Sequence, residues 1–150
     1  MRSYTFQSKQ VVPIPLKECW DFFSQPSNLG RITPPGMGFE MVSPVESKIY
    51  PGQIIIYKIK PLFGFPVTWV TEITNVREFL SFIDIQRMGP YKFWHHRHFF
   101  REVEGGVEIS DHVCYSPPYG ILGQVALPTI RKRLNKIFDY RRQKIVEFFK

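Results

Sequence analysis

Hydrophobic and polar positions alternate along much of this chain with the period of two that is typical of β-strands. The segment 4–12 shows the pattern first, with Tyr4 and Phe6 on one side, polar residues between them, and Pro13 directly after it. From residue 39 to residue 116 no long helical period occurs, and strand-like segments recur between turn signals. The pattern predicts six further strands, at about 39–46, 52–60, 66–76, 79–88, 91–104 and 106–117.

Helical spacing replaces this alternation in two short segments after the first strand. In the segment 16–23 the residues at helical spacing are Leu16, Cys19, Trp20 and Phe23. Pro15 lies near the start of this predicted helix, where proline is tolerated. The segment 26–32 adds one or two helical turns, which end at Thr33-Pro34-Pro35-Gly36 because two prolines and a glycine cannot continue a helix.

The last part of the chain predicts one long helix. Its stripe of positions at helical spacing consists of Ile130, Leu134, Ile137, Phe138, Arg141, Ile145, Phe148 and Phe149. Pro128 is either a first-turn residue of this helix or a kink in a helix that begins near Ile121, and the sequence leaves both open. A helix of about 22 residues is about 33 Å long, enough to cross a small sheet.

The order of elements is therefore one strand, two short helices, six strands and a long helix (β-α-α-β6-α). The turn signals between strands are Tyr50-Pro51-Gly52, Met88-Gly89-Pro90 and Glu104-Gly105-Gly106. We expect an α+β fold in one domain of residues 1–150, a curved seven-stranded antiparallel sheet wrapped around the long C-terminal helix. Curling such a sheet around one helix tends to leave a cavity between them.

Composition adds large rings and positive charge to this picture. The chain has 14 Phe, 7 Tyr and 3 Trp, which either fill a core or line a cavity, and its net charge is +7. The densest basic segment, 131–144, has few aromatic residues among its charges, which favours a solvated helix flank over a nucleic-acid partner. With two cysteines, no signal peptide and no apolar window of about 20 residues, we expect a cytoplasmic protein without stable membrane insertion.

Candidate chemistry concentrates in the strand 91–104, which holds three of the four histidines. Alternation puts His96 and His98 on one face and His95 on the other, although both faces are mixed in polarity. Three neighbouring strands have a clearer inward face, because one face of each carries bulky apolar residues. These faces are Trp69, Thr71 and Ile73; Phe82, Asp84 and Gln86; and Ile109, Asp111, Val113 and Tyr115.

Short motifs span essentially the whole chain. They are Asn28-Leu29, Pro34-Pro35, Phe39, Trp69-Val70-Thr71-Glu72-Ile73, Phe82-Ile83-Asp84-Ile85-Gln86, Gly89-Pro90-Tyr91, residues 94–100, Gly105-Gly106, Asp111, residues 115–120, Leu122-Gly123 and residues 137–142. In their order and spacing they resemble the START-like, or SRPBCC, superfamily, in particular its bacterial ligand-binding and polyketide cyclase-like branch. The resemblance implies a helix-grip fold with a deep cavity for a hydrophobic or amphipathic small molecule, and it selects the face of His96 and His98 as the inward one. It implies no particular reaction.

The candidate ligand-binding residues on these faces share the predicted cavity. They are Trp69, Thr71, Phe82, Asp84, Gln86, Trp94, His96, His98, Phe100, Asp111, Tyr115, Phe138 and Arg141. Polar groups are costly to bury unpaired, so these should bond one another or a ligand. Three interpretations stay open: a self-satisfied network that fixes strand register, a ligand pocket with a polar end, and a catalytic or metal site.

The catalytic candidates are His96, His98, Asp84 and Asp111. A histidine paired with a carboxylate could abstract a proton next to a carbonyl while the second histidine or Tyr115 stabilises the enolate. The same histidines with a carboxylate are a permissible metal set, but nearby histidines are common without metal, and we assign neither a metal nor another cofactor.

Arg141 is the second anomaly, because it interrupts the apolar stripe of the last helix. It either extends along the helix edge toward solvent or turns inward to pair with Asp84, Asp111 or a ligand carboxylate.

We expect a protein that binds a hydrophobic or amphipathic small molecule, lipid-like or polyketide-like, as a carrier or sensor. The alternative is a cyclase or dehydratase that acts on a polyketide-like substrate in the same cavity with a histidine general base. The third and least favoured class is a nucleic-acid or membrane-surface adaptor that uses the basic terminal helix, whose binding would depend strongly on salt.

Overall fold

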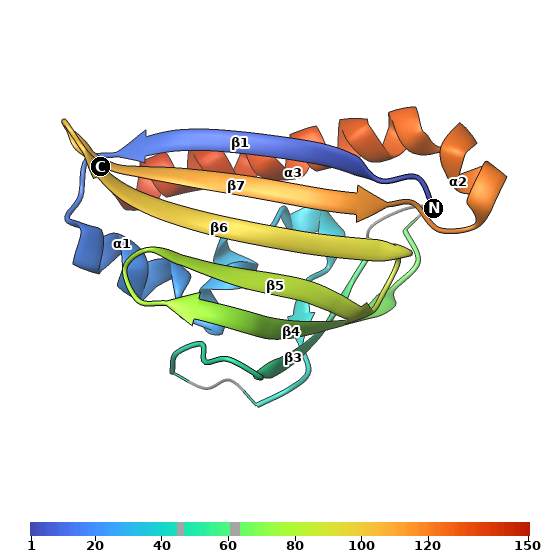
Figure 1. Cartoon of the computed structure of the whole chain (residues 1–150), viewed down its shortest axis with the longest axis horizontal. Coiled ribbons are helices and arrows are strands. Elements are labelled where there is room, and N and C mark those ends of the chain that lie inside the picture. Colours follow the sequence, from blue (N-terminus) through green and yellow to red (C-terminus); the bar gives the residue numbers. More distant parts are fainter. Residues whose placement is uncertain (45–46, 61–63) are drawn as a thin grey trace.

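Seven strands form one antiparallel sheet in the order β1-β7-β6-β5-β4-β3-β2, and the predicted α+β class is confirmed (Figure 1). The computed structural model describes residues 1–44, 47–60 and 64–150. The strands are β1 Tyr4–Val12, β2 Glu40–Met41, β3 Ile54–Ile59, β4 Val67–Arg77, β5 Ser81–Met88, β6 Phe93–Val103 and β7 Gly106–Ser116. The helices are α1 Leu16–Phe23, the 3-10 helices η1 Pro26–Ile32 and η2 Pro35–Met37, α2 Gly120–Val125 and α3 Leu127–Phe148.

The long helix begins at Leu127 and has Pro128 in its first turn, where the missing N–H of proline costs nothing. A separate short helix, α2, precedes it, so the alternative of one helix kinked at Pro128 is wrong. The 3-10 turn η2 was not predicted. Pro35 cannot continue a preceding helix, but it can begin a new helical turn, as it does here. No helix in the described part of the chain is both long and apolar enough to span a membrane.

The strand β2 is much shorter than the predicted strand at 39–46. The amides of Val42 and Ser43 both donate to the carbonyl of Ile56, and the Ser43 hydroxyl accepts from the amide of Ile56. The regular ladder therefore ends after Met41, because the side chain of Ser43 takes over one of its bonds. Residues 45–46 of that prediction lie outside the described residues.

The sheet curves, and its concave face carries the core. Register shifts between Val70 and Thr71 and between Ile73 and Asn75 interrupt the pairing of β4 with β5, and such irregularities bend a strand. The helices α1 and α3 lie on the same side of the sheet (Figure 1). The sequence therefore curls the sheet around its helices, as the alternating pattern predicted.

Two apolar clusters fill this concave side at its opposite ends. The Trp20 cluster consists of Val12, Cys19, Trp20, Ile32, Phe82, Phe100, Val107, Ile109 and Ile145. The Trp69 cluster consists of Met37, Ile59, Trp69, Trp94, Val113, Tyr115, Ile130, Leu134 and Phe138. Each strand of the pair β6 and β7 contributes to both clusters, so the inward residues between them lie in the middle of the molecule.

Candidate functional site

The inward positions between the two clusters are occupied by four ionisable side chains on three adjacent strands. Strand pairing places Asp84 of β5 opposite His96 of β6, and His98 of β6 opposite Asp111 of β7. The shortest contacts run diagonally: His96 Nε2 is 2.7 Å from Asp111 Oδ1, and His98 Nε2 is 2.5 Å from Asp84 Oδ2. Diagonal neighbours on one face of a sheet are within reach of such side chains.

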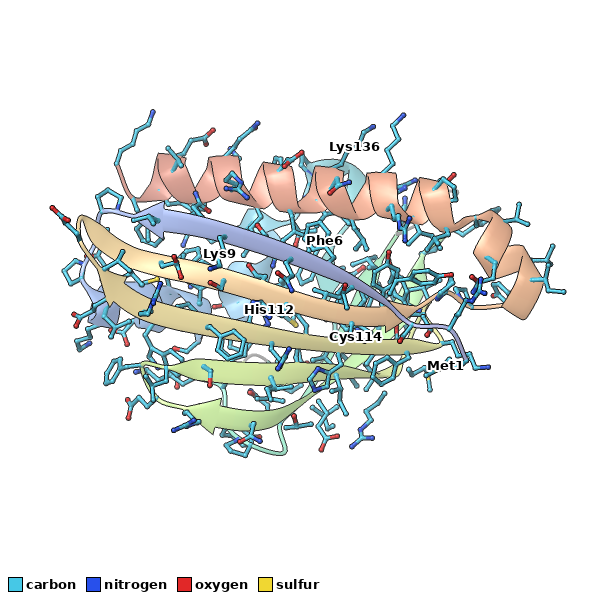
Figure 2. All side chains as sticks on the ribbon, turned by 45° about the horizontal axis from the view of Figure 1, so that its top comes forward. Met1, Phe6, Lys9, His112, Cys114 and Lys136 are labelled. Atoms are coloured by element: carbon cyan, nitrogen blue, oxygen red, sulfur yellow. The ribbon has the colours of Figure 1, made fainter. Side chains whose placement is uncertain are left out.

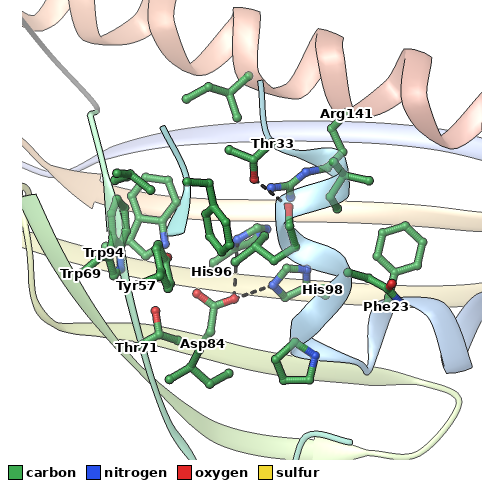
Figure 3. Close-up of a pocket in the computed structure, with 18 of the residues that line it drawn as sticks. Phe23, Thr33, Tyr57, Trp69, Thr71, Asp84, Trp94, His96, His98 and Arg141 are labelled. Carbon is green, nitrogen blue, oxygen red and sulfur yellow. Dashed lines mark hydrogen bonds and ion pairs between the residues drawn. The ribbon is translucent and has the colours of Figure 1, made fainter. Parts of the chain in front are cut away.

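The remaining ring nitrogens close these four residues into one network, which we call the His–Asp tetrad. His98 Nδ1 lies 3.2 Å from Asp111 Oδ1, and His96 Nδ1 lies 3.7 Å from Asp84 Oδ2. The two imidazole rings lie face to face with a tilt of 30°, and their centroids are 3.7 Å apart. Figure 3 shows Asp84 facing both rings from the cavity side. Each carboxylate therefore contacts both histidines.

The environments of the two histidines move their pKa values in opposite directions. Burial and the charge of His98 lower the pKa of His96. Burial alone would also lower the pKa of His98, but its bonds to Asp111 and Asp84 outweigh this and raise that pKa. Burial likewise opposes ionisation of both aspartates, yet the adjacent imidazoles hold the pKa of each below its usual range. Near pH 6.5, the ordinary pKa of histidine, the tetrad therefore has two carboxylates, one imidazolium and one neutral imidazole.

This charge state fixes the donors and acceptors of the tetrad. As an imidazolium, His98 donates from Nε2 to Asp84 and from Nδ1 to Asp111. The neutral His96 donates from Nε2 to Asp111, so its Nδ1 carries a lone pair. The separation of 3.7 Å between this Nδ1 and Asp84 is too long for a hydrogen bond. His96 therefore presents an unused acceptor.

A cavity of about 170 Å³ opens in front of the tetrad, between the sheet, η1 and α3. Its aromatic lining consists of Phe22, Phe23, Phe39, Tyr57, Trp69, Phe82, Tyr91, Trp94 and Phe138. An engineered cavity of about 150 Å³ in another protein holds one benzene ring. The cavity therefore accommodates about one ring with short substituents.

Two buried donors at this cavity have no hydrogen-bond partner among the described residues. They are Nε1 of Trp69 and Nε of Arg141. The guanidinium of Arg141 lies 4.9 Å from the centre of the Phe138 ring, and Figure 3 shows it reaching from α3 toward the cavity. Its charge helps to lower the pKa of Asp84, but the described residues include no ion pair between Arg141 and either aspartate. The cavity therefore combines unused donors with one unused acceptor.

Solved structures match nearly the whole chain at low identity. CV1439 of Chromobacterium violaceum has a TM-score of 0.75 at 12% identity and covers 97% of this chain and 96% of its own. BexL, a di-domain ARO/CYC from the BE-7585A biosynthetic pathway, has a TM-score of 0.73 at 16% identity over 99% of this chain and 50% of BexL. Ara h 8.0201 has a TM-score of 0.63 at 13% identity over 97% and 99% of the two chains. This chain has the START/SRPBCC helix-grip fold.

The fold that the motif resemblance implies is therefore confirmed. No protein-family model matches the chain, and no curated protein matches it. Within the helix-grip fold, function therefore has to be argued from the residues of this cavity.

Nine of the thirteen predicted site residues line the helix-grip cavity. They are Trp69, Thr71, Phe82, Asp84, Trp94, His96, His98, Phe138 and Arg141. The structure thus brings together acidic, basic and aromatic groups from three separate strands and the last helix.

The other four predicted residues do not line the cavity, each for a packing reason. Asp111 lies behind the imidazoles that it bonds, and Phe100 packs within the Trp20 cluster. Tyr115 contacts Tyr91 and Trp94, which do line the cavity. The amide of Gln86 exchanges hydrogen bonds with the backbone of Tyr91 and so holds the turn between β5 and β6.

The sequence argument missed several lining residues, chiefly Tyr57, Tyr91, Arg133 and Ile137. Ile137 was on the predicted stripe of the last helix. Tyr57 belongs to β3, where both faces carry isoleucine and parity gives no direction. Tyr91 follows a turn, where no periodicity exists. Arg133 resembled the solvated residues of its basic segment.

The donors that could hold a metal ion are Asp84, His96 and His98, whose ligand atoms lie within 4.8 Å of one another. Donors bound tetrahedrally to one zinc ion at 2.0–2.2 Å would be about 3.4 Å apart. The separation of 2.5 Å between His98 and Asp84 is instead that of a short, charge-assisted hydrogen bond. The geometry thus favours the hydrogen-bonded tetrad.

The tetrad predicts that the free energy of unfolding has a maximum near pH 6.5. As the pH falls below 6.5, the ordinary pKa of histidine, the unfolded chain binds increasingly more than one proton at this pair while the native protein still binds one, so stability rises with pH up to this point. Above pH 6.5 both histidines of the unfolded chain lose their protons, while His98 of the native protein keeps one. Stability therefore falls with pH until the raised pKa of His98 is passed. Urea unfolding across this range measures the slope, which is at most about 1.4 kcal/mol per pH unit.

His112→Gln is the matched control, because His112 lies outside the tetrad, and the maximum should persist in this variant. A stability that stays level between pH 6.5 and about pH 8 would contradict the assigned charges.

Proposed function

We propose that this protein binds a small amphipathic anion of about one aromatic ring, as a carrier or sensor. The observation that carries the proposal is the pair of unused donors, Trp69 Nε1 and Arg141 Nε, at an aromatic cavity. A buried donor without a partner costs about 1–3 kcal/mol, and a ligand acceptor would recover this free energy. The helix-grip fold supports a ligand-binding or cyclase role in general, and these donors support the anion.

The charges at the cavity favour one negative charge on the ligand. The two carboxylates and one imidazolium of the tetrad leave a net charge of minus one, which Arg141 offsets. Arg133 also lines the cavity and adds a positive charge from the next-but-one turn of α3. A monoanion would neutralise this excess, whereas a cation would add to it.

The cavity size restricts the ligand further. At about 170 Å³ it suits a single ring with short substituents better than a long lipid or a multi-ring polyketide. The rings of Trp69, Trp94 and Phe138 supply its apolar walls, which can enclose an aromatic body by edge and face contacts.

Titration calorimetry with phenylacetate and its neutral counterpart phenylacetamide tests the charge preference. We expect phenylacetate to bind at least about tenfold more tightly, because a charge-assisted hydrogen bond contributes about 1.5–3 kcal/mol. Arg141→Gln should abolish this preference. Arg77→Gln, at the exposed end of β4, lowers the net charge equally and should keep it. Equal affinity for acid and amide in the unaltered protein, or no binding of either, would contradict the proposal.

A second candidate function, a cyclase or dehydratase of polyketide-like substrates, is favoured by the lone pair on His96 Nδ1. His96 lines the cavity, and its Nδ1 carries a lone pair that is not hydrogen-bonded to Asp84, which is what a general base requires. A proton removed from the carbon next to a ligand carbonyl would pass to His96, and the positive charges of His98 and Arg141 would stabilise the enolate. Tyr115 has no such role, because it does not line the cavity.

Exchange of the methyl protons of para-acetylbenzoate in heavy water tests this chemistry without a full reaction. If His96 is a general base, the protein should accelerate exchange. General-base catalysis typically contributes about 10²–10⁴-fold, so His96→Gln should slow the exchange by about a hundredfold or more. His112→Gln on the outer face should leave it unchanged. Binding of para-acetylbenzoate without faster exchange would limit the protein to the binding function.

A further inference from the structure

The end of the molecule that carries α2 exposes large apolar side chains. Tyr119, Ile121, Leu122 and Val125 are each between 74% and 83% exposed. We call these four residues the α2 tip. Single exposed apolar residues are ordinary on a protein surface, but four within seven positions form a patch that marks an interaction site.

The packing of α2 at Gly123 keeps these apolar side chains in solvent. Its buried residue is Gly123, and a Cβ there would lie 1.9 Å from the carbonyl oxygen of Pro118. The inward side of α2 therefore accepts only glycine, and the apolar residues on either side of it point to solvent. If α2 packed on the core through its apolar side chains, these residues would face inward.

Other exposed apolar residues lie at the same end of the sheet. The pairing of Tyr4 with Tyr115 and of Phe93 with Ser116 brings the start of β1 and of β6 to the end of β7, from which α2 continues. Met1 is exposed there, and Figure 2 shows it near α2. The apolar surface thus extends beyond the tip along this edge.

The charge around the tip is uniformly positive. No aspartate or glutamate occurs from residue 112 to residue 138, while Arg131, Lys132 and Lys136 are exposed on the first turns of α3. The acidic residues Glu18, Glu78, Glu102, Glu104, Glu108 and Glu147 are distributed over other segments of the chain. Part of the net charge of +7 is therefore concentrated beside the exposed apolar residues.

We propose that the α2 tip docks this protein peripherally on an anionic lipid bilayer. The apolar side chains of the tip would enter the interface between headgroups and acyl chains, and Arg131, Lys132 and Lys136 would contact anionic headgroups. Charge complementarity is the argument for this partner, since apolar residues flanked by cations are the combination that binds such surfaces. Tyr119 is also of the type that favours the membrane interface.

The surface is separate from the cavity and stands without the proposed ligand. Arg133, which follows Arg131 and Lys132 in α3, lines the cavity. Docking would therefore place one wall of the cavity close to the bilayer. This proposal revises the role of the basic segment, which the sequence alone assigned to a solvated flank.

Sedimentation with vesicles tests the docking surface directly. The vesicles contain phosphatidylcholine with about 30% phosphatidylserine, or phosphatidylcholine alone, at low salt. We expect the full chain to bind the anionic vesicles at least about tenfold more tightly. The triple variant Ile121→Ser, Leu122→Ser, Val125→Ser should lose at least about tenfold of that binding, and Arg131→Gln, Lys132→Gln, Lys136→Gln a similar factor that vanishes at high salt.

Two matched controls protect this test. Leu80→Ser removes an apolar residue that is 52% exposed in the turn before β5. Arg77→Gln with Arg97→Gln removes distant positive charge, and both variants should bind vesicles nearly as the unaltered protein does. All the substituted residues of the tip are exposed, so thermal unfolding should remain close to that of the unaltered chain. Absent vesicle binding, or binding that the tip variant retains, overturns the proposal.

A protein partner would give a different result. Size-exclusion chromatography that shows self-association lost in the tip variant, with vesicle binding unchanged, would assign the surface to a second copy of the chain and overturn membrane docking. Arg141→Gln should alter ligand affinity without altering vesicle binding, so failure of the cavity proposal and failure of the docking proposal are distinguishable.

Discussion

Two carboxylates and two imidazoles buried between apolar clusters are the constraint on which the rest of this structure depends. Burial opposes every one of these charges, so the groups remain ionised only because each contacts the others. Removing one partner would leave an uncompensated buried charge, which typically costs about 3–5 kcal/mol. The register of three strands is therefore tied to the tetrad, because a shift of one residue would turn its side chains to the outer face.

The same constraint gives the cavity its character. Apolar clusters at both ends of the concave face leave the tetrad as a polar band across the middle, and the cavity opens in front of it. The tetrad satisfies most of its own hydrogen bonds, and the groups left for a ligand in the described part of the chain include the acceptor on His96 and the donors of Trp69 and Arg141. A polar end with few unused groups in an aromatic enclosure is suited to orienting one small molecule.

Much of this arrangement was predictable from the sequence, because periodicity determines which side chains share a face. The alternation in the strands of Asp84 and Asp111 placed both of them inward, and the helical spacing of residues 16–23 gave both ends of α1. The motif resemblance supplied the one choice that parity left open, the inward face of β6.

The remainder depended on information that a single strand or helix does not contain. The diagonal partners of the histidines follow from the register between strands, and local patterns do not encode register. The direction of Arg141 depends on the ring of Phe138 beneath it, and the role of Gln86 on a turn five residues away. The α2 tip was missed because its inward side is a glycine, so the helix has no apolar stripe that faces the core.

The central claim is that the tetrad holds one imidazolium and one neutral imidazole with a free Nδ1. Heteronuclear NMR of the histidine ring nitrogens at about pH 6.5 measures this directly, since protonated and unprotonated nitrogens have distinct chemical shifts. The structure predicts that both ring nitrogens of His98 are protonated and that His96 is protonated at Nε2 alone. Two neutral rings, two charged rings, or a proton on Nδ1 of His96 would contradict the account.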